Sequence, residues 1–508
     1  MAARRVWRPP LWAWGVLWLV VLAGIHKQAP ARLEGHWMLV TPLVVAAGIV
    51  LLHELWERPP ALTMCIAIAL RVFSGAWSQM GIGGVPLDRV FIIVALAQIL
   101  LRSPGAASMP RLKLRDVHLM MLLTLAYLVV SAAAAGTLSS AESIQAIVDE
   151  FGIAPYLGFL VGAAVFARRR ERNWLLATLV GVGIYLGITA VFESLGPHQL
   201  VFPSYIANVD AADTLGRVNG PFQSSVAEGC AAFACAVAAT IAFLQWKERV
   251  PRLFAAASIL LCLFACFATL ERGVWIATVA AVLTAALMSR RSRRLLLPGI
   301  AIALVAIGGL LAVSSTLAGK AESRAGDQRS IWDRKNQDAA GLRMVQARPL
   351  LGFGLGRYKT DSSGYFRQAQ DYPLSGRLVT EVVGEPEVVL PLHNLYLAYA
   401  VELGLIGAGL WLVTLAWGVG SAIFSPGPSS LLPWKRGLAA LAVFFIVVTF
   451  VNPKQPPFVP LLLWTWAGIA LGAGVGDLSL EREYLWRRQK ARDPRVAAVQ
   501  PKAPPLTS

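Results

Sequence analysis

Two motifs in one stretch decide how the chain is interpreted: RPLLGFGLG at residues 348–356 and PLHNLYLAYAVELGLIG at residues 391–407. The first is rich in glycine. The second begins a long apolar run, with His393 and Asn394 at its start and Glu402 inside it. Polar side chains at the mouth of an apolar helix predict a functional site at a membrane surface.

The composition around this stretch predicts an all-α polytopic membrane protein. Of 508 residues, 56% are hydrophobic and 15% are charged, and the mean hydropathy is +0.59. This balance disfavours a soluble multidomain protein. Apolar runs predict about 14 transmembrane helices, with one large loop, 314–391, between spans 11 and 12. The runs are 11–25, 37–53, 61–77, 88–101, 117–136, 153–167, 174–194, 225–245, 253–270, 273–289, 295–313, 394–416, 437–451 and 458–476.

The distribution of Lys and Arg predicts the orientation in the membrane. The net charge is +17, and basic clusters fall in alternate connections between the apolar runs. Because Lys and Arg in short loops are retained on the cytoplasmic side, both termini should be cytoplasmic and loop 314–391 extracytoplasmic. The basic clusters would then face anionic membrane lipids, so nucleic acid is not an expected partner.

Neither a disulfide framework nor a metal site is indicated. The five cysteines all lie in apolar runs. No histidine pair has the spacing of metal ligands, and no carboxylate cluster resembles a divalent-ion site. We therefore expect chemistry that needs no metal and no cofactor.

Two arginines on the predicted outer face are candidates for binding an anion. Arg217 precedes VNGPF at the entry to a span, and Arg272 follows Glu271 in a short turn between two apolar runs. Two guanidinium groups at one face could hold a diphosphate bidentately. Structural alternatives are equally compatible: Arg217 could be an interfacial anchor, and Arg272 could pair with Glu271.

The polar stretch has structural alternatives as well. His393 could cap a helix, and Glu402 could be the partner of Arg71 inside the bundle. Residues from Arg329 to Gln346 are typical of a helix lying along the membrane surface. The glycines of residues 352–356 favour turns over phosphate binding, because the segment lacks the Lys-Ser/Thr of a P-loop.

Taken in order, five motifs closely resemble the O-antigen ligase and O-antigen polymerase superfamily. They are R-x-x-x-P-F at 217–222, E-R-G-x-W at 271–275, RPLLGFGLG at 348–356, H-N-L-Y-L at 393–397 and E-L-G-L-I-G at 402–407. The resemblance implies a fold similar to GT-C glycosyltransferases and a shared core at about 200–420. The other parts would be N-terminal transmembrane helices at 1–199, C-terminal ones at 421–476, and a basic cytoplasmic tail at 477–508.

The resemblance also implies an activity. Such proteins, in the bacterial inner membrane, move a glycan from a polyprenyl (undecaprenyl) diphosphate carrier to a glycan or lipid acceptor hydroxyl, without a metal. In-line attack by the acceptor would invert the anomeric configuration. Arg217 and Arg272 match the arginines that hold the diphosphate, and His393 matches the catalytic histidine beside the acceptor. Asn394, Glu402 and Arg329 would support them. The product would be surface polysaccharide or lipopolysaccharide.

Three functions remain open at this point. A ligase transfers finished polymer to another acceptor, whereas a polymerase transfers the growing chain to the next carrier-linked repeat. The H-N-L-Y-L motif favours the ligase slightly. A transporter of lipid-linked sugars is an alternative of another class, but a transporter typically has charges in both of two repeated halves.

Overall fold

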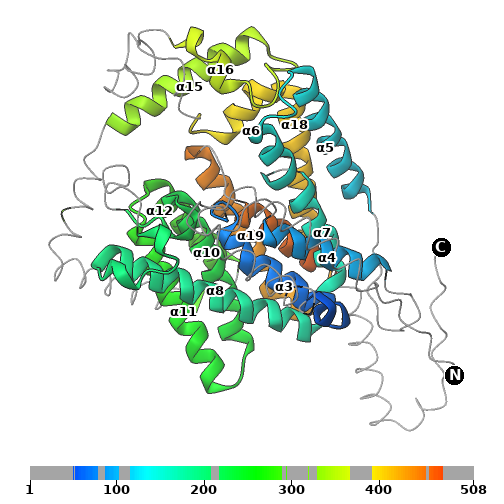
Figure 1. Ribbon diagram of the computed structural model, residues 1–508, viewed down its shortest axis with the longest axis vertical. Coiled ribbons are helices and arrows are strands. Elements are labelled where there is room, and N and C mark those ends of the chain that lie inside the picture. Colours follow the sequence, from blue (N-terminus) through cyan, green and yellow to red (C-terminus); the bar gives the residue numbers. More distant parts are fainter. Residues whose placement is uncertain are drawn as a thin grey trace, which may run out of the picture.

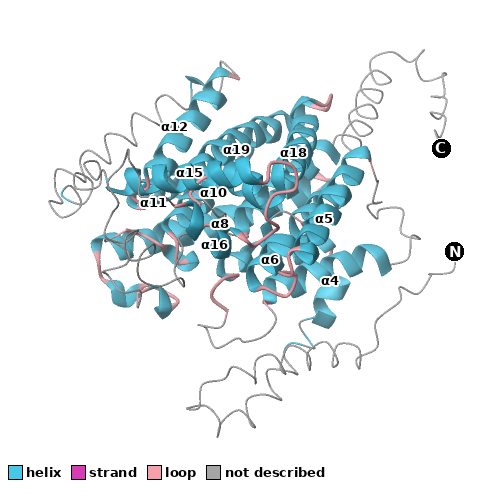
Figure 2. Ribbon diagram, turned by 90° about the horizontal axis from the view of Figure 1, so that it is seen from above, coloured by secondary structure: helices cyan, strands magenta, loops and turns pink. Residues whose placement is uncertain are grey.

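The computed structural model shows a helical protein and describes most of its residues (Figure 1). The described residues are 48, 50, 52–77, 86–101, 115–150, 152–207, 217–288, 293–294, 319, 329–366, 392–452 and 457–472. Every regular element within these ranges is a helix, with no strand (Figure 2). The all-α prediction is therefore confirmed for this part of the chain.

The helices are α3 (Pro60–Leu70), α4 (Leu87–Leu101), α5 (Asp116–Ala134), α6 (Ala141–Gln145), α7 (Ile153–Val165), α8 (Arg169–Leu195), α10 (Ser225–Gln245), α11 (Arg249–Ala268), α12 (Arg272–Leu287), α15 (Arg329–Ala347), α16 (Tyr358–Asp361), α18 (Leu395–Phe424) and α19 (Leu432–Val451). A last helix covers Phe458–Gly472. Seven helices within the described ranges are long and apolar enough to cross a membrane, and three shorter ones are also apolar.

The predicted apolar runs mostly coincide with these helices. Runs 11–25 and 295–313, and most of run 37–53, lie outside the described residues, as do much of loop 314–391 and the tail 477–508. Each of the other predicted runs overlaps a helix. The multi-pass prediction is thus supported, while the number 14, the orientation and the extent of the loop stay predictions.

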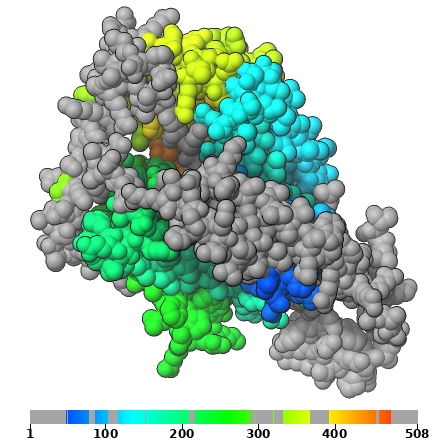
Figure 3. Space-filling view, viewed as in Figure 1, coloured from blue at the N-terminus to red at the C-terminus, as the bar shows by residue number. Residues whose placement is uncertain are grey.

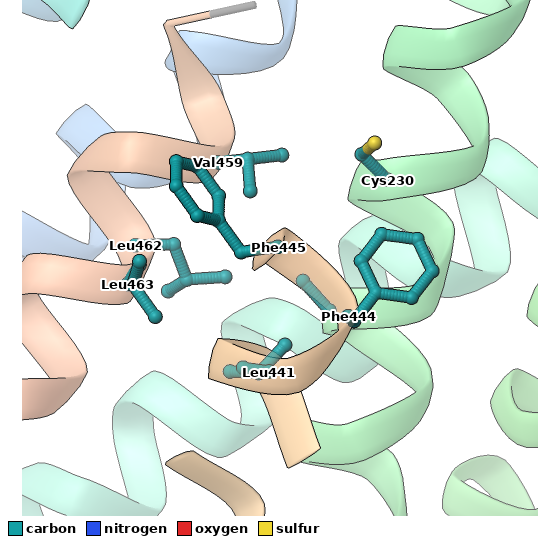
Figure 4. A pocket seen from close by; sticks show the side chains of 8 residues that line it. Cys230, Leu441, Phe444, Phe445, Val459, Leu462 and Leu463 are labelled. Carbon is teal, nitrogen blue, oxygen red and sulfur yellow. The ribbon is translucent and has the colours of Figure 1, made fainter. Parts of the chain in front are cut away.

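Close packing of small side chains joins the central helices. α10 packs against both α8 and α11, and α12 packs against α19. Gly187 of α8 touches α11 so closely that an added Cβ would lie 2.3 Å from Leu261 Cβ. The five cysteines are buried and free. One apolar gap, between α10, α19 and the last helix, is lined by Cys230, Phe444, Leu462 and their neighbours, and its lining has no charged group (Figure 4).

The glycine-rich segment forms turns that hold a break in α18. Gly404 interrupts the helix at φ 67° and ψ 179°. Around the break, Phe353 N–H donates to Val401 O (2.9 Å) and Gly354 N–H donates to Glu402 O (2.8 Å). Gly352, Gly354 and Gly356 all have positive φ. The predicted turns are therefore present, and these two amides are already used within the protein.

Gly404→Ala is expected to destabilise the protein, because this backbone conformation is essentially restricted to glycine. An added Cβ would also lie 2.1 Å from Leu350 O. We expect a loss of at least about 2 kcal/mol, measured as a lower Tm in detergent. Gly409→Ala is the matched control on the same helix, since nothing lies within 4 Å of its added Cβ. An unchanged Tm for Gly404→Ala would contradict the interpretation.

The alternative in which Arg71 pairs with Glu402 is wrong. Arg71 is fully buried and forms ion pairs with Asp88 (2.5 Å) and Asp149 (2.7 Å). Arg89 pairs with the other oxygen of Asp149. Two carboxylates thus compensate the buried guanidinium, as charges at membrane depth require. The cluster ties the end of α3 to the start of α4 and to the segment before α7.

Candidate active site

The residues that follow Arg272 and His393 both contact the C-terminal part of α19. On one side, Gly273 of α12 packs so closely that an added Cβ would lie 2.5 Å from Val451 Cγ2. On the other side, the Tyr396 hydroxyl of α18 donates to Ile446 O (3.2 Å). Arg272 and His393 therefore lie at the same end, here called the site end.

The figures show how the helices that carry these residues are arranged. α15 and α16 lie beyond the ends of α5 and α18, and α12 lies below them beside α19 (Figure 1). In the space-filling view, the orange end of α19 is visible between the yellow surface of α15 and α16 and the green surface below (Figure 3).

The loop of residues 217–222 is fixed to three helical segments at the site end. Val218 N–H donates to Ala268 O at the end of α11 (3.2 Å). Asn219 and Gly220 N–H donate to the Glu193 carboxylate of α8, at 3.2 and 3.0 Å. The Tyr205 hydroxyl donates to Pro221 O (2.9 Å). These contacts determine where Arg217 lies.

Tyr205 donates its hydroxyl proton to the loop. Burial first, and then the nearby Glu228 carboxyl, raise the pKa of the Tyr205 phenol well above its usual value. A phenol already carries its proton at physiological pH, and the raised pKa extends the range in which Tyr205 can donate to the loop to more alkaline pH.

An ion pair holds Arg217 on Glu271, the residue before Arg272. Arg217 Nη1 lies 2.5 Å from Glu271 Oε1, and the side chains are 16% and 6% exposed. The Ser225 hydroxyl donates to the same oxygen (3.0 Å). Because Glu271 and Arg272 are consecutive, Arg217 contacts the residue next to Arg272 in the chain. Arg217 Nε is buried without a hydrogen-bond partner in the described structure.

A glutamine from α15 orients His393. Gln337 Oε1 lies 2.7 Å from His393 Nδ1. An amide oxygen can only accept a hydrogen bond, so Nδ1 donates. In the neutral ring, Nε2 then carries the lone pair. His393 thus has the tautomer that a general base acting through Nε2 requires.

The supporting residues have structural contacts. Asn394 Oδ1 accepts the N–H groups of Tyr396 (3.1 Å) and Leu397 (3.2 Å), so Asn394, and not His393, caps α18. Glu402 Oε1 accepts Tyr358 N–H (3.3 Å), which joins α18 to α16. Arg329 is the first residue of α15, at a distance along the helix from Gln337.

Glu193 and Gln337 were not predicted from the sequence. Glu193 is the carboxylate at the end of a long apolar run. An ionisable residue at membrane depth has a high free-energy cost, and this could have identified Glu193 as a candidate. Gln337 has no comparable signal, because a glutamine on an amphipathic helix is ordinary in sequence. Its role follows from the packing of α15 on α18.

The fold and site define a multi-pass helical membrane protein with paired arginines and an oriented histidine at one end of the bundle. Residues 256–412 match the family model for O-antigen ligase, so the chain carries a domain of the O-antigen ligase and polymerase superfamily. The family implies a glycan-transferring enzyme that acts in surface polysaccharide synthesis. No curated protein matches the chain.

The matched segment contains Arg272, Arg329, His393, Asn394 and Glu402. Arg217 lies upstream of it, and the ion pair with Glu271 connects Arg217 to the matched domain.

Proposed function

We propose that the protein transfers a glycan from a polyprenyl diphosphate carrier, such as undecaprenyl diphosphate, to an acceptor hydroxyl. The reaction would occur on the extracytoplasmic face of the bacterial inner membrane, in the manner of an O-antigen ligase. The observation that carries the proposal is the shared location of the Arg217–Glu271–Arg272 group and the Gln337-oriented His393 at the site end.

The arginines would stabilise the leaving group. As the bond between the anomeric carbon and the diphosphate oxygen breaks, its electron pair passes to the diphosphate, whose negative charge increases. Fixed donors aimed at such developing charge are among the largest contributions to catalysis. Arg272 and the unsatisfied Nε of Arg217 provide guanidinium N–H donors, which suit phosphate oxygens.

His393 would activate the acceptor. The acceptor oxygen forms the new bond to the anomeric carbon while its proton passes to Nε2 of His393. The bond from Nδ1 to Gln337 keeps the proton on the far side of the ring and stabilises the imidazolium that forms. Attack in line with the departing diphosphate inverts the anomeric configuration, and the protein residues of this scheme need no metal.

The test is the size distribution of carrier-linked and surface glycan in a strain that lacks the protein. Long chains stranded on the carrier are expected, which supports a ligase. Single repeats in place of long chains would identify the runner-up, a polymerase with the same donor chemistry. Wild-type protein should restore the normal distribution, and His393→Ala should not. Normal distributions in the deletion strain, with no redundant enzyme present, would contradict glycan transfer.

A further inference from the structure

One face of α15 changes from apolar to polar as it approaches His393. The residues of this face follow helical spacing of three and four: Asp333, Asn336, Gln337, Ala340 and Met344. Ala340 and Met344 are fully buried, and Met344 belongs to an apolar cluster formed with the start of α18. The polar half of the face is buried too, with Asn336 4% and Gln337 1% exposed.

The polar half has hydrogen-bonding groups without partners. Four side-chain polar atoms are buried and form no hydrogen bond in the described structure: Oδ1 and Nδ2 of Asn336, Nε2 of Gln337 and Oδ1 of Asp333. Buried polar atoms in folded proteins are nearly always hydrogen-bonded to protein, water or ligand. Several such atoms on one stretch of helix therefore indicate a polar molecule that binds there.

This polar stripe ends at the candidate base. Gln337 accepts the hydrogen bond of His393 Nδ1 through Oε1, and its Nε2 has no hydrogen-bond partner in the described structure. Asp333, one turn earlier on the helix, is half-buried, as is His393, so the buried amides of Asn336 and Gln337 lie between two half-buried groups. A molecule bound along it would have one end beside the imidazole.

We propose that Asp333, Asn336 and Gln337 form a saccharide subsite that holds the acceptor by its hydroxyl groups. The inference rests on the proposed function, because it places the acceptor beside the base. A hydroxyl both donates and accepts, as does an amide, and a carboxylate accepts. The Asp333 carboxylate would repel a phosphate, so the subsite suits sugar hydroxyls and not the diphosphate of the carrier.

The test measures binding without any transfer reaction. The full-length protein in lipid nanodiscs is titrated with two lipid-free probes from the host: its core oligosaccharide, released by mild acid, and its single glycan repeat. Binding of at least one probe is expected to protect α15 from hydrogen–deuterium exchange. Asn336→Leu keeps the side-chain size and removes the polar atoms, and it should raise the Kd at least about tenfold.

Stability separates this role from a structural one. Because the amide atoms of Asn336 have no partners, Asn336→Leu should leave the Tm unchanged or raise it while affinity falls. A residue needed only for folding would lower the Tm. Leu342→Ala is the matched control. Leu342 lies on the same helix and is 54% exposed, so its truncation should leave the Kd unchanged.

The outcomes distinguish the subsite from the proposed function. If wild-type protein binds neither probe, or Asn336→Leu binds as well as wild type, the subsite is wrong even if the protein transfers glycan. If binding depends on Asn336 but purified protein never transfers glycan, the subsite stands and the proposed function fails.

Discussion

His393→Ala is expected to slow glycan transfer by a factor of about 10² to 10⁴, the range that a positioned general base contributes. The acceptor hydroxyl would lose the group that takes its proton. Initial rates with purified protein, carrier-linked donor and acceptor measure the effect. The Tm should change little, because Asn394 and not His393 caps α18.

Gln337→Leu provides a graded comparison. The imidazole remains, but Nδ1 loses the acceptor that fixes its tautomer, so the rate should fall by less than in His393→Ala, about tenfold. Asn394→Ala should affect stability instead, because loss of the helix cap should lower the free energy of unfolding by about 1 kcal/mol. Full activity in His393→Ala would exclude His393 as the base.

The helices were predictable because apolar runs and their interruptions are local features of sequence. The start of α18 follows from Asn394 and the apolar residues after it. The turns at Gly352, Gly354 and Gly356 follow from glycine's access to positive φ. Both depend on the residue itself and on its immediate neighbours.

Partners of charged groups could not be predicted, because they depend on how distant helices pack. Arg71 meets Asp149 across 78 positions of sequence, whereas the alternative considered from the sequence was Glu402. Gln337 meets His393 across 56 positions. In each case several residues of suitable chemistry were available, and only the three-dimensional arrangement selects among them.

The paired arginines give the second large effect. Arg272→Ala is expected to reduce transfer by about 10² to 10³, as loss of one preorganised donor to developing charge does elsewhere. Arg272→Lys should recover part of the activity, since the charge returns without the planar fork. The rates are measured at saturating acceptor with varied donor, so that donor KM and kcat are obtained separately.

Arg217 needs a different design, because Arg217→Ala would leave Glu271 buried without its partner and destabilise the fold. Glu271→Gln leaves no buried carboxylate without its partner, and the glutamine oxygen can still accept a hydrogen bond from Arg217. If Arg217 binds the diphosphate, Glu271 competes with the donor for the guanidinium, and Glu271→Gln should lower the donor KM several-fold. If Arg217 only anchors the loop to α12, Glu271→Gln should lower the Tm and leave the donor KM unchanged. A lower KM with a lower Tm would mean that the ion pair holds Arg217 ready and that the donor displaces Glu271 from it.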